Sequence, residues 1–222
     1  FEYYQKKNLI RLDFSSQELV KNKTISSFAT NTYWSKEIKK ILGTRPYFVG
    51  IDAWLTLPPL NMMDKYDDIG NFVSSQMWHR DCDKLRDIKV MTYLTDVPSE
   101  NDGPFEIVQG TNKLNFFHPK NYLMGSAMRV KDNYVQNKMK KSIFTFLGEK
   151  GDSIIADTRA LHRGKTILNQ NSYRLVLQLY FSNHVFGKVK LLEPPTRDWD
   201  SYDIWHENFN RKDCFYNTLF KF

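Results

Sequence analysis

Cysteine is scarce in this chain, which has two, Cys82 and Cys214, among 222 residues. They lie far apart and have neither the spacing of a zinc finger nor that of a redox Cys-x-x-Cys pair, so they indicate free thiols in a reducing compartment. No apolar run is long enough to span a membrane, and the N-terminus has no signal-peptide pattern. We therefore expect a cytoplasmic location, although the first residue, Phe1, is not a start methionine.

The charge balance excludes little. The formal net charge is +7, from 32 Lys and Arg against 25 Asp and Glu. A solvated surface explains this excess most simply, and a field that attracts small anionic molecules comes next. The sequence has no nucleic-acid-binding motif, which makes a nucleic-acid partner unlikely on sequence grounds. We expect a small-molecule substrate and no membrane partner; an anionic substrate would suit the field.

Aromatic residues, by contrast, are abundant at 15% of the chain. Because aromatic side chains favour strands, we expect a mainly β core with flanking helices. The length suits one domain over residues 1–222. Residues 1–71 would supply the N-terminal strand, the helices and a first core strand, and residues 72–181 the functional core. Residues 182–222 would pack back on it.

Two helices are indicated near the N-terminus. The first is capped by Ser15 or Ser16, and the second begins at Ser35 and stops at Gly43. Strands are expected where aromatic and β-branched residues cluster between turn formers: 8–14, 47–57, 72–81, 88–97, 105–108, 142–147, 153–157 and 173–181. We expect 72–81 and 88–97 to be antiparallel neighbours because their connection is short. Residues 61–70 read as a loop, and Asn101-Asp102-Gly103-Pro104 is a strong turn signal.

A possible metal site starts in Met77-Trp78-His79-Arg80-Asp81. On a strand, His79 and Asp81 would share one face, where both could reach one metal ion. A second, distant histidine would complete a 2-His-1-carboxylate site of the non-haem iron type. Alone, the motif is weak evidence, because His-x-Asp arises often by chance, and a solvated strand end carrying a surface ion pair explains it more simply.

His162 is the best source of that histidine. It follows Gly151-Asp152, the apolar run 153–157 and a second turn. Further along, Arg174 opens the apolar strand 175–181, where a fixed guanidinium suits a carboxylate ligand.

In these pieces the chain resembles the phytanoyl-CoA dioxygenase-like family of Fe(II)/2-oxoglutarate oxygenases. The resemblance runs from about residue 72 to 181, and residues 8–20 are similar to the family's N-terminal strand and helix. The matching motifs, in the family's order and spacing, are Trp78-His79-Arg80-Asp81, Asn101-Asp102-Gly103-Pro104-Phe105 with Gln109-Gly110-Thr111, Gly151-Asp152 through Asp157 to His162, and Tyr173-Arg174.

The resemblance implies a double-stranded β-helix, a cupin-like jelly roll of two antiparallel sheets. It also implies that His79, Asp81 and His162 ligate Fe(II), that Arg174 pairs with the C5 carboxylate of 2-oxoglutarate, and that O2 is consumed as 2-oxoglutarate becomes succinate and CO2. Three protein ligands leave room for a bidentate cosubstrate and O2. Because Asp81 is retained, hydroxylation is favoured over halogenation.

Departures from the family pattern occur at Gly110-Thr111-Asn112, where Gly-Ser-His is common, and at Ile167-Leu168, which displace the usual Asn-x-Ser run. Two other classes stay open: a jelly-roll binding module, and a cupin-type metalloprotein that does not use 2-oxoglutarate, in which Arg174 would have no cosubstrate to hold.

Several further residues are assigned more weakly. Gln76, Thr92, Tyr93 and Ser172 are candidates to line the cosubstrate pocket. Asp157 could orient His162 or merely end a strand, and Trp78 is expected to pack. Residues 111–141 are expected to form a lid that sets specificity. The remaining histidines are expected to be structural or exposed: His118, His184 and His206. The oligomeric state does not follow from the sequence.

Overall fold

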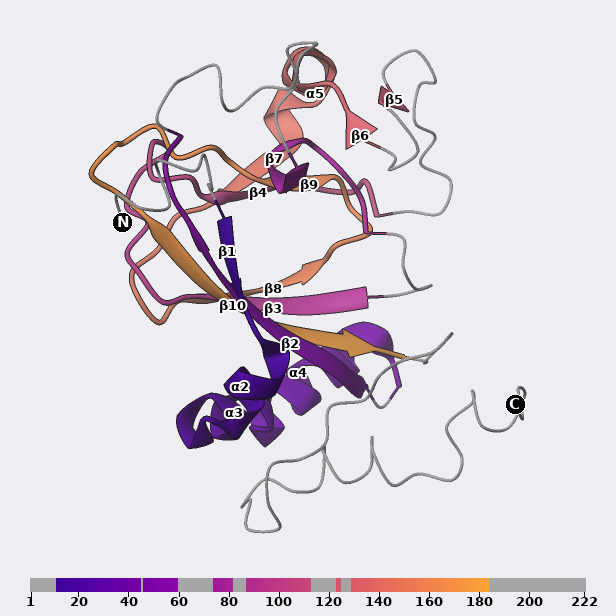
Figure 1. Ribbon diagram of the computed structural model, residues 1–222. Coiled ribbons are helices and arrows are strands. Elements are labelled where there is room, and N and C mark those ends of the chain that lie inside the picture. Colours follow the sequence, from indigo (N-terminus) through magenta and orange to yellow (C-terminus); the bar gives the residue numbers. More distant parts are fainter. Residues whose placement is uncertain are drawn as a thin grey trace.

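A computed structural model describes residues 11–44, 46–59, 74–81, 87–112, 123–124 and 129–183. These residues form two antiparallel β-sheets that face each other, with helices on their outer surfaces (Figure 1). This is the double-stranded β-helix expected from the sequence. None of the helices in these ranges is both long and apolar enough to cross a membrane.

The larger sheet has five strands in the order β1-β2-β10-β3-β8. β1 spans Arg11–Phe14, β2 Tyr47–Thr56, β3 Asp87–Tyr93, β8 Ser153–Asp157 and β10 Arg174–Ser182. β10 is paired along its length with β2 and along most of it with β3. Such two-sided pairing leaves little freedom to a side chain that projects from β10.

The smaller sheet has three strands in the order β7-β4-β9, and a separate two-stranded ladder lies beside it. β4 spans Phe105–Val108, β7 Ile143–Phe146 and β9 His162–Gly164; β5 (Leu123–Met124) pairs with β6 (Arg129–Val130). The turn before β4 is confirmed. Gly103 has φ 72°, and a Cβ there would lie 2.5 Å from a side-chain carbon of Ile167, so only glycine fits.

Helices cover the outer face of the larger sheet (Figure 1). α2 spans Ser16–Lys21, α3 Lys23–Ala29 and α4 Thr32–Leu42. In α4, Trp34, Ile38 and Leu42 recur at helical spacing and are buried against the sheet. On the far side of the molecule, α5 (Asp132–Lys138) and the 3-10 turn η4 (Lys140–Ser142) lie outside the smaller sheet.

Three apolar clusters hold these layers together. One fills the space between the helices and the larger sheet, and a second, with Met91, Tyr93 and Phe105, joins the two sheets. The third packs Trp78 and Leu161 against α5 through Val135. Trp78 is fully buried, which confirms its packing role.

Several expected elements differ. Residues 72–81 were expected to form a strand paired with 88–97, but the described part contains the 3-10 turn η2 (Ser74–Gln76) and two isolated bridges, Trp78 with Val130 and His79 with His162. β3 pairs instead with β10 and β8. The pattern-based expectation was wrong because the bridging partners of 78 and 79 are distant in sequence.

The helical region also differs in detail. α4 begins three residues before Ser35, and its cap is Asn31, whose side chain accepts a hydrogen bond from Tyr33 N. α3, capped by Asn22, was not expected. Gly43 ends α4 in the left-handed conformation, as expected. The loop at 61–70, residues 113–122 and 125–128 of the expected lid, the cysteines and residues 184–222 of the C-terminal segment lie outside the described residues.

Candidate metal and cosubstrate site

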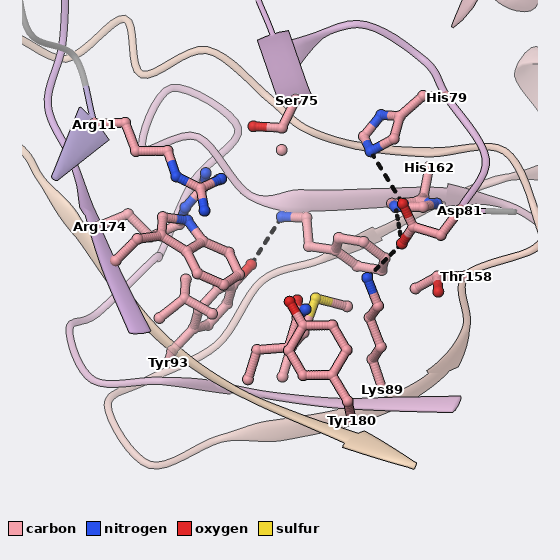
Figure 2. A pocket seen from close by; sticks show the side chains of 16 residues that line it. Arg11, Ser75, His79, Asp81, Lys89, Tyr93, Thr158, His162, Arg174 and Tyr180 are labelled. Carbon is pink, nitrogen blue, oxygen red and sulfur yellow. Dashed lines mark hydrogen bonds and ion pairs between the residues drawn. The ribbon is translucent and has the colours of Figure 1, made fainter. Parts of the chain in front are cut away.

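The site lies in a cavity of about 180 Å³ between the two sheets. β1, β2, β3 and β10 line it on one side and β4 and β9 on the other, and the segment carrying Ser75, His79 and Asp81 borders it (Figure 2). The cavity thus lies inside the jelly roll, where rigid strands position side chains from distant parts of the sequence.

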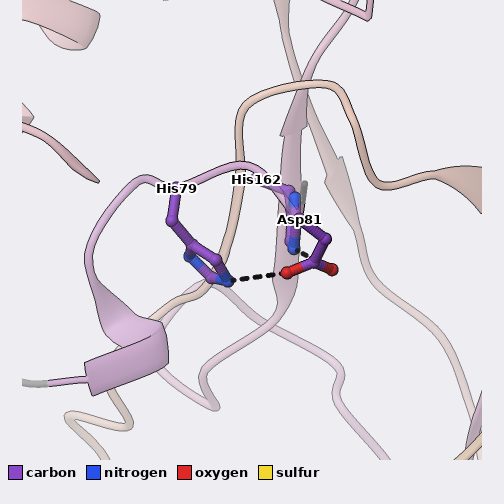
Figure 3. A group of neighbouring side chains, drawn as sticks. All are labelled: His79, Asp81 and His162. Carbon is purple, nitrogen blue, oxygen red and sulfur yellow. Dashed lines mark ion pairs between the residues drawn. The ribbon is translucent and has the colours of Figure 1, made fainter. Parts of the chain in front are cut away.

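His79, Asp81 and His162 converge at one end of this cavity (Figure 3). His79 Nε2 lies 3.8 Å from Asp81 Oδ1, and His162 Nε2 lies 3.4 Å from Asp81 Oδ2. The three prospective ligand atoms all lie within 4.8 Å of one another. Atoms that share one metal at about 2.1 Å are about 3 Å apart, so small side-chain rotations would bring this group to ligand distance.

Main-chain hydrogen bonds set this arrangement. His79 and His162 exchange a reciprocal pair, with N–H to carbonyl distances of 3.0 and 2.9 Å. Asp81 N donates to Thr158 O at 3.0 Å. A reciprocal pair places two residues directly opposite each other, and here their imidazole centroids are 4.3 Å apart. The isolated bridge between His79 and His162 therefore positions His79 for the metal site, which is the role that was expected of a strand over 72–81.

The imidazoles are also held in the orientation that metal binding needs. His79 Nδ1 donates to the carbonyl of Met77 at 2.7 Å, and His162 Nδ1 donates to that of Ala160 at 2.9 Å. A carbonyl can only accept, so the proton of each neutral ring lies on Nδ1 and the lone pair of Nε2 faces Asp81.

Electrostatics keep His79 neutral and Asp81 ionised. Burial and the neighbouring His162 lower the pKa of His79 to about 4. Burial of Asp81 on its own would raise the pKa of its carboxyl, but the neighbouring His162 and the Lys89 ammonium outweigh it and hold that pKa well below its usual range. A neutral imidazole and a charged carboxylate are the forms that bind a divalent metal.

Arg174 occupies the other end of the cavity. Its side chain is buried, and its Nε and Nη1 have no hydrogen-bond partner among the described residues. Its Nη2 lies 3.5 Å from Thr56 Oγ1. Burial lowers the pKa of the guanidinium. An unpartnered buried cation costs free energy, so the fork is suited to an anionic ligand that reaches it through the cavity.

Gly164 makes room for this guanidinium. A Cβ at position 164 would lie 2.7 Å from Arg174 Nη2. Tyr93 borders the same end, where its hydroxyl donates to Phe146 O at 2.9 Å and accepts from Phe105 N at 2.8 Å. Both of these hydrogen bonds tie the larger sheet to the smaller one beside the arginine.

Among the weaker sequence candidates, Tyr93 lines the cavity and the other three do not. Thr92 projects from the opposite face of β3 and bonds to Ser153 Oγ at 2.7 Å. Gln76 is buried and accepts from Thr166 Oγ1 at 2.8 Å, and Ser172 bonds to Asp102. All three side chains have partners elsewhere in the fold.

Asp157 does not contact His162. Its carboxylate accepts from Arg159 and from Asn112 Nδ2, the latter at 3.0 Å. Thr111 is the closer support: its hydroxyl accepts from Leu161 N at 2.8 Å and donates to Val108 O at 2.7 Å. The Gly110-Thr111-Asn112 departure from the family pattern therefore keeps a polar role next to His162.

Lys89, Arg11 and Tyr180 line the cavity but were not among the sequence candidates. Lys89 Nζ forms an ion pair with Asp81 Oδ2 and lies 4.7 Å from the centroid of the Tyr180 ring. Lys89 could have been predicted to line the cavity together with Tyr93, because Lys89, Met91 and Tyr93 alternate along β3 and so share one face. No local pattern marked Arg11, on β1.

Comparisons with known proteins agree with this geometry. The model of the phytanoyl-CoA dioxygenase (PhyH) family matches residues 10–175. No curated protein matches the chain.

Among solved structures, HygX from Streptomyces hygroscopicus, with nickel, 2-oxoglutarate and hygromycin B bound, has a TM-score of 0.53 at 15% identity, covering 86% of this chain and 77% of its own. The epimerase SnoN, in complex with Fe3+, alpha ketoglutarate and nogalamycin RO, has a TM-score of 0.55 at 13% identity over 85% of this chain and 77% of its own. The carbocyclase SnoK from nogalamycin biosynthesis has a TM-score of 0.51 at 14% identity over 77% of this chain and 62% of its own.

At these identities the solved structures show a shared fold. The family match covers most of the chain and includes His79, Asp81 and His162 as well as Arg174. The chain belongs to the phytanoyl-CoA dioxygenase family and is an enzyme of the Fe(II)- and 2-oxoglutarate-dependent oxygenase class.

Proposed function

We propose that the chain is a dioxygenase that hydroxylates a small molecule while 2-oxoglutarate and O2 are converted to succinate and CO2. His79 Nε2, one oxygen of Asp81 and His162 Nε2 hold Fe(II), and Arg174 binds the C5 carboxylate of 2-oxoglutarate. Bound iron supplies the activation of O2, and the protein residues supply geometry and charge.

The observation that carries the proposal is the buried guanidinium of Arg174, whose Nε and Nη1 have no hydrogen-bond partner among the described residues, in the same cavity as the metal-type triad. A jelly-roll binding module would have no reason to bury a charged fork in the same cavity as two histidines and a carboxylate. A cupin-type metalloprotein without 2-oxoglutarate would leave Arg174 unsatisfied. A dicarboxylate that spans from the metal to the arginine satisfies both ends at once.

The protein residues prepare the site for this reaction. The proton on Nδ1 of each histidine keeps Nε2 available to the metal. Arg174 is buried between the sheets, and the low local dielectric there strengthens its interaction with a carboxylate. Val176 and Phe105 contribute the apolar walls.

We also propose that residues 111–141 act as a lid. The described part of this segment is anchored beside the metal ligands, since Asp132 on α5 accepts from Trp78 Nε1 at 2.9 Å and from Arg163 Nη1 at 2.5 Å. Trp78 and Arg163 immediately adjoin His79 and His162 in sequence. Rigid strands would thus hold the chemistry while the lid varies the pocket.

The test is a screen of small metabolites with Fe(II), 2-oxoglutarate and isotopically labelled O2. Succinate release identifies a substrate, and the product should carry labelled oxygen. The names of SnoN and SnoK, an epimerase and a carbocyclase, point to the alternative outcomes. A product with unchanged mass, or one that has lost hydrogen without gaining oxygen, would contradict hydroxylation, and absence of succinate under every condition would contradict the proposal as a whole.

A further inference from the structure

Lys89 is a buried cation at the metal end of the cavity. It is 8% exposed, and its ammonium contacts Asp81 and lies against the face of Tyr180 (Figure 2). The hydroxyl of Tyr180 donates to Asp52 Oδ2 at 2.6 Å, which fixes the ring behind the ammonium. An ammonium has three donors. The carboxylate takes one and the ring face occupies another side, so a donor remains for a molecule in the cavity.

The charges in the loaded site do not cancel. Among the described residues, three cationic side chains line the cavity, Arg11, Lys89 and Arg174, against one carboxylate, Asp81. Asp13 pairs with Arg11 at 2.5 Å and offsets its charge. A ferrous ion and a 2-oxoglutarate dianion add equal and opposite charges. The side chains that line the cavity therefore carry more positive than negative charge once metal and cosubstrate are bound, which favours an additional anion.

Resting on the proposed function, we infer that the primary substrate is a small organic anion whose acid group binds Lys89 Nζ. Arg174 would be taken up by the cosubstrate, and Arg11 lies beside it and pairs with Asp13 (Figure 2). Among the described lining residues, Lys89 is the cation at the metal end, and it keeps a donor for the substrate. Because Lys89 contacts a metal ligand, an acid group bound to it places the neighbouring carbon atoms close to the iron. The positive net charge of +7 would draw such anions towards the protein.

A pair of fluorinated probes tests this directly, namely trifluoroacetate and the neutral trifluoroethanol. The protein is loaded with Co(II), a paramagnetic stand-in for Fe(II), and saturating 2-oxoglutarate, and the 19F line width of each probe is compared with that in Zn(II)-loaded protein. We expect Co(II) to broaden the acid and not the alcohol. Equal broadening of both probes, or of neither, would overturn the inference.

Variants assign the effect to one side chain. Lys89→Met keeps an unbranched side chain one atom shorter and removes the charge, and it should weaken trifluoroacetate binding by roughly tenfold or more, whereas Lys89→Arg should retain binding. Arg11→Met is the matched control, a cation lining the same cavity, and should have a smaller effect. A larger loss from Arg11→Met than from Lys89→Met would contradict the assignment. The difference in 19F broadening between trifluoroacetate and trifluoroethanol is measured on the wild-type protein. It therefore tests the preference for an anion even if a variant fails to bind metal.

Failure of the proposed function gives a different result. If Co(II) does not broaden the 1H signals of 2-oxoglutarate, the site does not hold metal and cosubstrate together, and the proposed function is wrong. If 2-oxoglutarate is broadened and trifluoroacetate is not, the substrate inference alone is wrong.

Discussion

At the metal end of the cavity, His79 and Asp81 come from a segment without a regular strand, and His162 opens a strand of three residues. At the opposite end, Arg174 and Tyr93 project from strands that are paired on both sides. The first end is held by a few main-chain hydrogen bonds and can adjust as metal binds. At the second, paired strands hold the backbone of both residues, so Arg174, the proposed cosubstrate anchor, is in place before any ligand arrives.

The metal end should show the largest effect of a single substitution. Asp81→Ala removes the only carboxylate among the described residues that line the cavity, and with it the charge that offsets the metal. We expect loss of Fe(II) binding and of succinate formation, measured by metal titration and by succinate assay. Asp157→Asn, at the end of β8 and paired with Arg159, is the control and should retain both. Full activity of Asp81→Ala would show that the triad is not the metal site.

The rigid end should respond differently. Arg174→Met should weaken 2-oxoglutarate binding by about 100-fold, since a bidentate charged contact is lost, while Fe(II) binding persists. Without cosubstrate the same variant should be more stable than wild type, because an unpartnered buried charge is gone. Thermal denaturation with and without 2-oxoglutarate checks both expectations. A drop in the melting temperature of the ligand-free variant would mean that Arg174 already has a stabilising partner.

A smaller effect is expected at Gly164. In Gly164→Ala the new methyl group would press on Arg174 Nη2 at 2.7 Å and turn the guanidinium away from the cavity. The charge remains, so we expect 2-oxoglutarate affinity to fall by roughly tenfold with unchanged metal affinity. Gly50→Ala is the matched control, because its Cβ would meet Tyr180 at 3.7 Å, an ordinary contact. Isothermal titration of each variant makes the comparison, and equal affinities would contradict the close approach.

The smallest effect is expected at Thr111, the support beneath His162. Thr111→Val leaves the buried N–H of Leu161 without its acceptor and should lower the free energy of unfolding by about 1–3 kcal/mol, while activity falls only modestly. Thr111→Ser keeps the hydroxyl and should stay close to wild type. Denaturant unfolding of both variants is the check. Equal losses for Val and Ser would contradict the account, because only the Val variant lacks the hydroxyl that accepts from Leu161 N.

The contrast between the two ends also explains what the sequence could predict. On β3 and β10 side chains alternate between faces, so the shared face of Lys89, Met91 and Tyr93 was readable from local pattern. The conformation of 74–81 was not, because Trp78 and His79 bridge to Val130 and His162, which are distant in sequence. The metal-type residues were found through their order and spacing, and their convergence needed the fold.

The cavity lining shows the same limit. Arg11 and Lys89 carry no motif, and only the pairing order β1-β2-β10-β3 places them around one space. Thr92 was a reasonable candidate by position, but the side of β3 that faces the cavity depends on how the two sheets stack. Which residues share one face of a strand can be predicted from local alternation. Which of the two faces points into the cavity cannot, because it depends on the packing of the two sheets.

The most direct test of the central claim is an anaerobic absorption titration of the wild-type protein. Fe(II) followed by 2-oxoglutarate should produce a weak visible charge-transfer band, and the band should be absent with His162→Ala and need far more 2-oxoglutarate with Arg174→Met. A correctly folded wild-type protein that gives no band at saturating Fe(II) and 2-oxoglutarate would contradict the account.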